Sequence, residues 1–395
     1  MQYQKFAADY IFNGYEIIPA NNVVVITNTE GRILDIVSKN EAGEDILFVK
    51  GMISPGFINC HCHLELSHLK GIIPKKTGLI DFILQILNKR STTAEIIQDA
   101  IEKAEAEMIQ NGIVAVGDIA NTTNTIFQKQ KHQLYYHNFV ELSGFSPQIA
   151  SQRFQAGLTI YQTFLQHFPK QTSIVAHAPY SVSPELFQLI AEASSGQQVT
   201  SIHNQESIHE NPFFLDGSGD FNRLYQQLQV PIHSFYTPSK QTSLATVHPK
   251  MQQNKNILWV HNNFTSAPDI QILEQNNHHQ NHYWCICIAA NKYIENVVPP
   301  IKQFHQSKFD CVIGTDSLAS NHQLNILEEL KIIKQHFSLI SDKHLLQWST
   351  LNGAKALNIQ SEFGSIEKGK KPGLNCIDNL ADGIITQNST VHKLI

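Results

Sequence analysis

The segment His61-Cys62-His63, within the run ISPGFINCHCHLELSHLKG of residues 53–71, is the first place where residue types and spacing suggest chemistry. An apolar stretch reaches it after a Pro-Gly turn, which indicates that the histidines end a β-strand. Because side chains alternate between the faces of a strand, His61 and His63 point the same way. Two imidazoles on one face can bind one metal ion. Two solvent-facing or hydrogen-bonded histidines explain an isolated His-x-His pair equally well.

Four more apolar segments end in a residue that could bind metal or carry a proton. IVAHAPYSVS contains His177, and TSIHNQES contains His203 followed by Glu206. ILWVHNNFTS contains His261, and CVIGTDSLASN contains Asp316. If these segments are strands of one parallel barrel, their final residues meet at one end of it. The pattern therefore predicts a metal site surrounded by acid–base groups, although a hydrogen-bonded core histidine remains the alternative for His261 alone.

Eight predicted strands, separated by helical patterns, would position these residues. The strands cover residues 56–62, 113–119, 134–142, 173–178, 199–204, 257–262, 283–288 and 310–315. Helical patterns include residues 93–111, 184–193, 325–337 and 342–358. This alternation predicts an α/β fold, a (β/α)8 TIM barrel over residues 56–360. A doubly wound sheet is the runner-up, but no Gly-x-Gly-x-x-Gly turn follows the first strand.

The two ends of the chain have a different pattern. Short strands separated by turns are predicted at residues 7–12, 15–19, 23–27, 33–38 and 46–49, and again at 374–377 and 383–387. We expect residues 1–55 and 361–395 to pair into one small β-sandwich domain beside the barrel. Residues 205–256 are a long polar insert with aromatic residues, and such inserts at the active face of a barrel form lids or substrate walls.

Composition excludes several classes of partner. The hydrophobic fraction of 42% and charged fraction of 16% are those of an ordinary soluble protein. A net charge of −5 argues against a nucleic-acid or membrane partner, and we find neither a signal-peptide pattern nor an apolar run long enough to cross a membrane. The six cysteines lack the Cys-x-x-Cys spacing of zinc knuckles and redox motifs, so we predict reduced thiols in a cytoplasmic protein.

The motifs PGFINCHCH, AHAPYSVSP, SIHNQES, VHNNFTS, GTDSLASN and GSIEKGKKPG resemble, in order and spacing, those of the amidohydrolase superfamily. The resemblance spans nearly the whole chain. It is strongest to the aminohydrolase branch, which holds S-adenosylhomocysteine, adenosine-type and aminofutalosine deaminases together with triazine chlorohydrolases. The resemblance implies four metal ligands, namely His61, His63, His203 and Asp316. It also implies catalytic roles for Glu206 as proton shuttle, for His261 in orienting the attacking water, and for Asp316.

Each residue type suits its implied role. Three neutral imidazoles and one carboxylate leave an open position on a divalent ion, where the pKa of a bound water falls to near neutrality. The water must lose a proton while a substrate ring nitrogen gains one, and Glu206, close to His203 in the chain, can carry it. Asp316 can accept the second proton, and His261 can stabilise the developing charge.

The resemblance also implies one metal ion rather than two. Two-metal relatives bridge their ions with a carboxylated lysine, usually on the fourth strand. Here that strand, SIVAHAPYS, has no lysine and offers His177 instead. Zinc suits the nitrogen-rich ligand set, and iron(II) or manganese would fit the same residues.

Five residues are predicted to contact substrate, namely Glu65, Ser67, His177, Tyr180 and Ser317. The HLE-x-S pattern that contains Glu65 and Ser67 resembles aminofutalosine deaminases. His177 occupies the position that meets a ribose or a similar group in nucleoside-type relatives. Glu65 could equally orient a ligand imidazole, and a hydrogen-bonded turn residue is the alternative for Tyr180 and Ser317.

The predicted function is hydrolytic deamination of an amino-substituted heterocycle by a metal-bound hydroxide. The resemblance implies an adenine-type nucleoside derivative, such as aminofutalosine, as the small-molecule substrate, and a homodimer as the assembly. The alternatives are cyclic-amide hydrolysis, chlorohydrolase-like displacement and a non-catalytic metal-binding barrel. Residues 287–291 read CIAAN where aminofutalosine-type relatives have a proline after the cysteine, so we expect an altered substrate wall.

Overall fold

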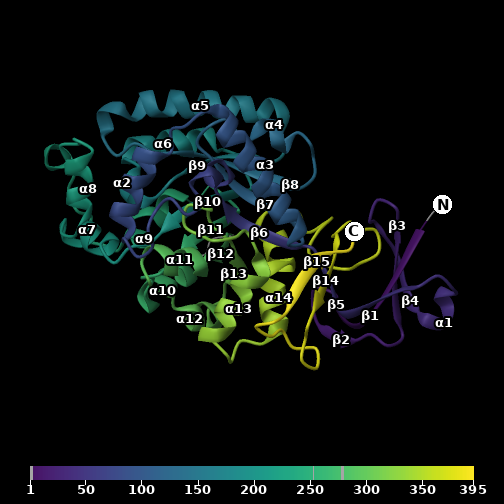
Figure 1. The fold of residues 1–395 in the computed structure, drawn as a ribbon. Helices are drawn as coiled ribbons and strands as arrows, with labels where there is room; N and C mark the ends of the chain where they lie inside the picture. The colour runs from purple at the N-terminus through teal and green to yellow at the C-terminus, as the bar shows by residue number, and fades with distance from the viewer. Residues whose placement is uncertain (1–2, 252, 277–279) are drawn as a thin grey trace.

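The computed structural model describes residues 3–251, 253–276 and 280–395, and its centre is a ring of parallel strands (Figure 1). Two four-stranded sheets make up the ring. The first contains β6 (Phe57–Cys62), β7 (Ile113–Ala120), β8 (Tyr135–Leu142) and β9 (Thr172–Ala176). The second contains β10 (Val199–Asn204), β11 (Asn256–His261), β12 (Asn281–Ile286) and β13 (Asp310–Ile313). Nearly every residue of these strands is buried, as expected for parallel sheets covered by helices.

The two sheets are joined at both seams. At one seam the backbone N–H of His203 donates to the carbonyl of His177 at 3.0 Å, which joins β10 to the end of β9. At the other, the backbone N–H groups of Thr315 and Asp316 donate to the carbonyl of His61 at 3.1 and 3.0 Å. The eight strands therefore close on themselves. The predicted α/β TIM barrel is confirmed, and the doubly wound sheet is excluded.

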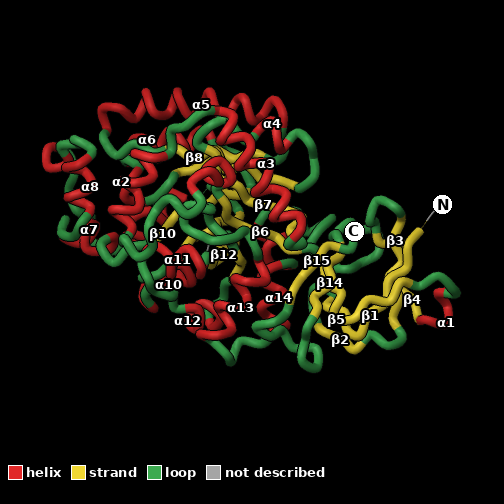
Figure 2. The backbone as a smooth tube through the Cα atoms, in the orientation of Figure 1, coloured by secondary structure: helices red, strands yellow, loops and turns green. Residues whose placement is uncertain are grey.

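Helices surround the barrel on its outside (Figure 2). They are α2 (Leu79–Lys89), α3 (Ala94–Gln110), α4 (Ile126–Lys129), α5 (Ala150–His167), α6 (Pro184–Ala193), α7 (Glu210–Asp216), α8 (Phe221–Gln227), α9 (Ser243–Val247), α10 (Ala267–Gln275), α11 (Ile288–Ile294), α12 (Ile301–Gln306), α13 (Ile326–His336), α14 (Asp342–Ser349) and α15 (Leu351–Ala356). Short 3-10 helices cover Leu64–Leu69, Pro147–Ile149, Pro179–Ser181, Ile232–Ser234 and His248–Met251. Among the described residues, no helix has both the length and the apolar character that crossing a membrane requires.

Local sequence explains where several helices begin and end. Ser183 accepts a hydrogen bond from the backbone of Leu186 at 3.2 Å, and Pro184 occupies the first position of α6. The single helix predicted for residues 342–358 is wrong, because Thr350 separates α14 from α15 with φ −133° and ψ −88°. The Thr350 hydroxyl donates to the Leu346 carbonyl at 2.6 Å, a local bond that competes with the helical ladder.

The ends of the chain meet in one mixed seven-stranded sheet beside the barrel (Figure 1). Its strands are β1 (Tyr3–Phe12), β2 (Ile17–Pro19), β3 (Val23–Asn28), β4 (Ile33–Ser38), β5 (Leu47–Pro55), β14 (Leu374–Asp378) and β15 (Thr390–Lys393), and α1 (Lys39–Ala42) follows β4. The order is β15-β14-β5-β1-β3-β4, with β2 on β1. On this topology we propose that residues 1–55 and 361–395 form one domain and residues 56–360 another.

One predicted strand of this sheet, residues 383–387, is wrong. Ala381 and Ile384 instead close a tight turn with reciprocal backbone hydrogen bonds of 3.0 and 2.9 Å, and the last strand begins later, at Thr390. The apolar pattern of residues 383–387 arises because one residue, Ile385, is buried, and not because these residues pair with another strand. Its side chain is buried, and its backbone N–H donates to the Asp342 carboxylate at 2.6 Å.

Residues 205–256, between β10 and β11, contain α7, α8 and α9, which the sequence pattern did not predict. Their aromatic side chains pack into a cluster with Phe145 from the loop after β8. Phe213 stacks on Tyr236 with ring centroids 4.4 Å apart, and Phe145 stacks on Tyr225 at 4.9 Å. The insert is therefore a packed wall, and its movement as a lid stays a prediction.

A buried ion pair supports the chain directly after the His-x-His segment. Lys129 Nζ donates to Asp118 Oδ2 at 2.6 Å and to Asn138 Oδ1 at 2.8 Å, and neither charged side chain is exposed. The other oxygen of Asp118 accepts the backbone N–H of Leu64 at 2.8 Å. Asp118 thus fixes the turn that follows His63, while Lys129 compensates its charge.

Replacing Lys129 with methionine is expected to lower the free energy of unfolding by about 3–5 kcal/mol, because the Asp118 carboxylate would stay buried without a cation. Lys131→Met is the matched control: it breaks an exposed pair with Glu102, 3.1 Å apart, and should cost at most about 1 kcal/mol. Urea unfolding of both variants measures the difference. Equal losses would contradict the role given to the buried pair.

Candidate metal centre

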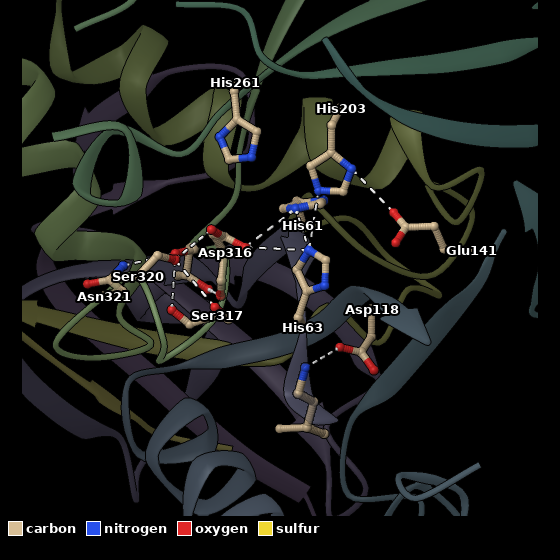
Figure 3. A network of polar contacts seen from close by, with 12 residues as sticks. His61, His63, Asp118, Glu141, His203, His261, Asp316, Ser317, Ser320 and Asn321 are labelled. Carbon is tan, nitrogen blue, oxygen red and sulfur yellow. Dashed lines mark hydrogen bonds and ion pairs between the residues drawn. The ribbon is translucent and has the colours of Figure 1, made fainter. Parts of the chain in front are cut away.

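Three histidine side chains meet at the carboxyl ends of the barrel strands (Figure 3). His61 lies near the end of β6, His63 directly follows that strand, and His203 lies near the end of β10. The Nε2 atom of His63 is 3.2 Å from that of His61 and 3.3 Å from that of His203. All three side chains are buried. They are brought together as the alternation of the His-x-His strand and the barrel geometry predicted.

Asp316 adds a carboxylate to the three imidazoles. It follows β13 in a left-handed backbone conformation with φ 58°, and its Oδ1 lies 3.5 Å from His63 Nε2 and 3.7 Å from His61 Nε2. Its Oδ2 accepts a hydrogen bond from Ser320 Oγ at 2.5 Å. Ligand atoms at the corners of a tetrahedron around zinc are about 3.3 Å apart, given zinc–nitrogen distances of about 2.0–2.1 Å. Four of the distances between these donor atoms, from 3.2 to 3.7 Å, are close to this spacing.

The charge states of these groups suit a cation. Burial, reinforced by the neighbouring histidines, holds the pKa of His61 well below its usual range, so its imidazole is neutral. Burial would raise the pKa of Asp316, but the imidazoles of His63 and His261 outweigh it and lower that pKa, so the carboxylate is ionised. Neutral imidazoles and an ionised carboxylate are the forms that bind metal.

Glu141, at the end of β8, orients His203. The Nδ1 atom of His203 is 2.9 Å from the carbonyl oxygen of His177 and 3.3 Å from Oε1 of Glu141. These acceptors place the proton on Nδ1 and leave Nε2 directed at the centre. Burial opposes a charge on His203, but Glu141 raises its pKa to about 9, so without metal the ring carries a proton that a bound ion would displace. The sequence analysis missed Glu141, although an acidic residue ending the strand YYHNFVEL could have indicated it.

Glu206 and His261 lie together beside the imidazole cluster. Oε1 of Glu206 is 3.7 Å from Nε2 of His261, and both side chains are buried. Burial raises the pKa of Glu206 well above its usual range, so this carboxyl holds a proton easily. Nδ1 of His261 is 2.7 Å from Oδ1 of Asn291, which fixes the orientation of the ring.

Asn291 belongs to the CIAAN segment, which forms the start of α11 rather than a loop. Its residues Ile288 and Ala290 are buried and do not line the cavity at the metal centre, which this helix borders only through Ile294. This segment thus supports His261 through Asn291 and does not line the cavity, whereas we predicted a changed substrate wall.

Asn291→Ala is expected to lower kcat by about 10–100-fold while metal content stays unchanged, because the His261 ring loses the acceptor that orients it. Asn291→Asp keeps an oxygen at the same place, so its kcat should fall less than that of Asn291→Ala. Steady-state rates and metal analysis of both variants make the test. Equal losses would mean that Asn291 acts through the packing of α11.

Three of the five predicted substrate contacts face a cavity of about 590 Å³ at the metal centre. They are His177, Tyr180 and Ser317. Burial lowers the pKa of His177 to about 4, and its Nδ1 lies 2.5 Å from Ser181 Oγ, so the ring is neutral and held in place.

Glu65 and Ser67 are not among the residues that line this cavity, which corrects the prediction that they contact substrate. Glu65 Oε2 accepts from the backbone and hydroxyl of Thr122 at 2.9 and 2.7 Å, and its Oε1 pairs with Arg90 at 3.2 Å. Ser67 Oγ donates to the Leu64 carbonyl at 2.7 Å. Glu65 thus ties two neighbouring segments to the turn after His63, whereas Ser67 bonds within its own 3-10 helix.

The cavity has a polar end and an apolar wall. The polar end contains His63, Glu141, His177, His203, Glu206, His261, Asp316 and Ser317. The apolar wall contains Leu79, Phe82, Ile83 and Ile86 from α2, Ile160 from α5, and Leu224, Tyr225 and Leu228 from the insert. A flat polar ring with an apolar substituent would match this division.

Comparisons with known proteins agree with this geometry. The model of the amidohydrolase family matches residues 52–393. A curated adenosine deaminase of Helicobacter pylori is 25% identical over 335 residues, covering 83% of this chain and 79% of that protein. The crystal structure of Helicobacter pylori aminofutalosine deaminase with methylthio-coformycin has a TM-score of 0.78 at 21% identity, covering 97% and 93% of the two chains. A zinc-bound adenosine deaminase from Xanthomonas campestris has a TM-score of 0.74 at 19% identity, covering 95% and 84%.

Proposed function

The chain belongs to the amidohydrolase family, and on this premise we propose that it deaminates an adenine-type heterocycle by metal-dependent hydrolysis. One observation carries the proposal. A four-donor metal centre and a proton-holding carboxyl, Glu206, share the polar end of one cavity. Hydrolytic deamination needs an activated water and a group that moves protons beside it.

The residues divide the chemistry between them. A divalent ion bound by His61, His63, His203 and Asp316 supplies Lewis acidity and lowers the pKa of water. Glu206 takes a proton from the water and delivers it to the ring nitrogen next to the reacting carbon. His261, held by Asn291, orients the water through its Nε2.

The products account for every atom of the reaction. Water adds its oxygen to the ring carbon, the carbon–nitrogen bond breaks, and the amino group leaves as ammonia with protons passed on by Glu206 and Asp316. Glu206 takes the first proton as a carboxylate and gives it up as a neutral carboxyl, and a pKa raised by burial makes these two forms more nearly equal in free energy.

We propose zinc as the metal and one ion at the barrel centre. Three nitrogen donors and one oxygen suit zinc, although iron(II) and manganese accept the same set. The adenosine deaminase from Xanthomonas campestris holds zinc. The residues of β9, Thr172–Ala176, include no lysine that could bridge a second ion.

An adenine-type nucleoside with an apolar substituent is the substrate class that fits the cavity best. The polar end offers neutral His177 to a sugar hydroxyl, and the apolar wall of α2 and α8 is left for the substituent. Curated relatives are named adenosine, methylthioadenosine/S-adenosylhomocysteine and aminodeoxyfutalosine deaminases. Cyclic-amide opening or halide displacement on the same scaffold is the second candidate.

Ammonia release by the zinc-loaded protein tests the proposal. The panel contains adenosine, S-adenosylhomocysteine, methylthioadenosine and aminofutalosine, with aminated pyrimidines and pterins as comparison. We expect the wild-type protein to release ammonia from at least one nucleoside. The Glu206→Gln protein should release none from the same nucleoside. No ammonia from any panel member, with metal shown to be bound, would reject deamination and favour ring opening or displacement.

A homodimer in the cytoplasm remains the proposed assembly and location. The dimer rests on the family resemblance. Sedimentation analysis would show a particle of about twice the 44.5 kDa chain mass, and a species at the chain mass over the working concentration range would reject the dimer.

A further inference from the structure

A second group of potential metal ligands lies far from the barrel centre, on the sheet formed by the chain ends. Cys376 and Asp378 are on β14, and His392 is on β15. In the antiparallel pairing, Cys376 lies directly opposite His392. Residues opposite each other, and residues two apart on one strand, share a face of the sheet. The three side chains therefore project together.

Their ligand atoms are close enough to share one ion. Cys376 Sγ is 3.2 Å from Asp378 Oδ1, and His392 Nδ1 is 3.0 Å from Asp378 Oδ2. One ligand atom from each residue lies within 4.8 Å of the other two. Cys376 is buried, whereas Asp378 and His392 are partly open to solvent, with side-chain exposures of 30% and 53%. An ion could enter from solvent and find the thiol at the bottom of the group.

The backbone around the thiol is specialised for close approach. The register between β1 and β5 shifts at Ala8 and Tyr10, and Asp9 at this bulge accepts the backbone N–H of Gly51 at 2.8 Å. Gly51 has φ 117°, and a Cβ there would collide with the carbonyl oxygen of Ile377. The glycine lets β5 lie against β14 beside the cysteine, and Sγ of Cys376 is 3.4 Å from the Lys50 carbonyl oxygen.

We propose that Cys376, Asp378 and His392 form a second metal site that takes a divalent transition metal such as zinc. A thiolate, a carboxylate and a neutral imidazole are zinc ligands, and their two negative charges balance those of the ion. On binding, the thiol loses its proton to solvent as the sulfur–metal bond forms. Water completes the tetrahedron.

An ion pair between His392 and Asp378 with a thiol at its side is the simpler explanation of the same contacts. It gives the buried Cys376 thiol only two weak donor contacts, at 3.2 Å from Asp378 Oδ1 and 3.4 Å from the Lys50 carbonyl oxygen. A thiol is a weak hydrogen-bond donor, whereas a bound cation would satisfy the thiolate, the carboxylate and the imidazole at once. Bound metal would also tie β15, the last strand of the sheet, to β14.

Cobalt(II) distinguishes the two sites because only one has a sulfur donor. The apo-protein, loaded with cobalt(II), is expected to bind two equivalents and to show a thiolate-to-cobalt charge-transfer absorption. Cys376→Ser should abolish that absorption and leave one equivalent bound. His392→Ala, at an exposed position, should weaken binding at this site by on the order of tenfold or more and keep the fold.

His63→Ala is the matched control, since it disables the barrel centre and should leave the sulfur absorption in place. One cobalt per chain with no sulfur absorption would overturn the proposal. An absorption that persists in Cys376→Ser would also overturn it, because the signal would then come from one of the five other cysteines.

Discussion

Replacing Glu206 with glutamine is expected to lower kcat by about 10²–10⁴-fold while the bound metal is retained. Glutamine has nearly the same shape and keeps one oxygen near Nε2 of His261, now 3.7 Å from the carboxylate. It cannot take a proton from water and pass it on. Glu206 is buried and is not one of the four donors, so the metal should remain.

Steady-state ammonia release at saturating substrate, together with metal analysis, measures this effect. Glu192→Gln is the matched control, because Glu192 is exposed on α6 and its replacement should leave kcat unchanged. A metal-loaded Glu206→Gln protein with the wild-type kcat would remove Glu206 from the mechanism. A protein that had lost its metal would show instead that Glu206 supports the metal centre.

The barrel could be predicted because its signals are local. A parallel strand buried on both faces is a short apolar run, and its end is marked by the first polar residue. His61, His203 and Asp316 each lie at such a point or within two residues of it, and a barrel brings such points together whatever lies between them. The order of the motifs then gave the family, which the match over residues 52–393 confirms.

Features that depend on partners distant in the sequence could not be predicted in the same way. Glu65 follows the His-x-His segment and resembled a substrate contact, but its donors, Thr122 and Arg90, lie on other loops. Glu141 lies on another strand than His203, and the two side chains meet only because of the register of the barrel strands. The helices of the insert are stabilised by an aromatic cluster that includes Phe145, and no periodic pattern in the insert predicts that packing.

Removal of the Asp316 side chain is the second change with a large expected effect, because this residue acts on both the metal and the proton. Asp316→Ala takes away the only carboxylate among the four donors, whose Oδ1 lies 3.5 Å from His63 Nε2. Loss of a residue that only supports a metal ligand typically lowers metal affinity by about 10–100-fold. Loss of the Asp316 carboxylate should lower it further. Activity should stay low even at metal concentrations that fill the site, since the second proton acceptor is also absent.

Ser320→Ala separates these two contributions. It removes the hydroxyl that donates to Asp316 Oδ2 at 2.5 Å and leaves the carboxylate itself in place. Affinity should then fall by about 10–100-fold at most, and excess zinc should restore the rate. Chelator competition gives the affinities, and ammonia release with and without excess zinc gives the rates. An Asp316→Ala protein that excess zinc restores fully would limit Asp316 to metal binding, and one with full metal and full rate without added zinc would overturn both roles.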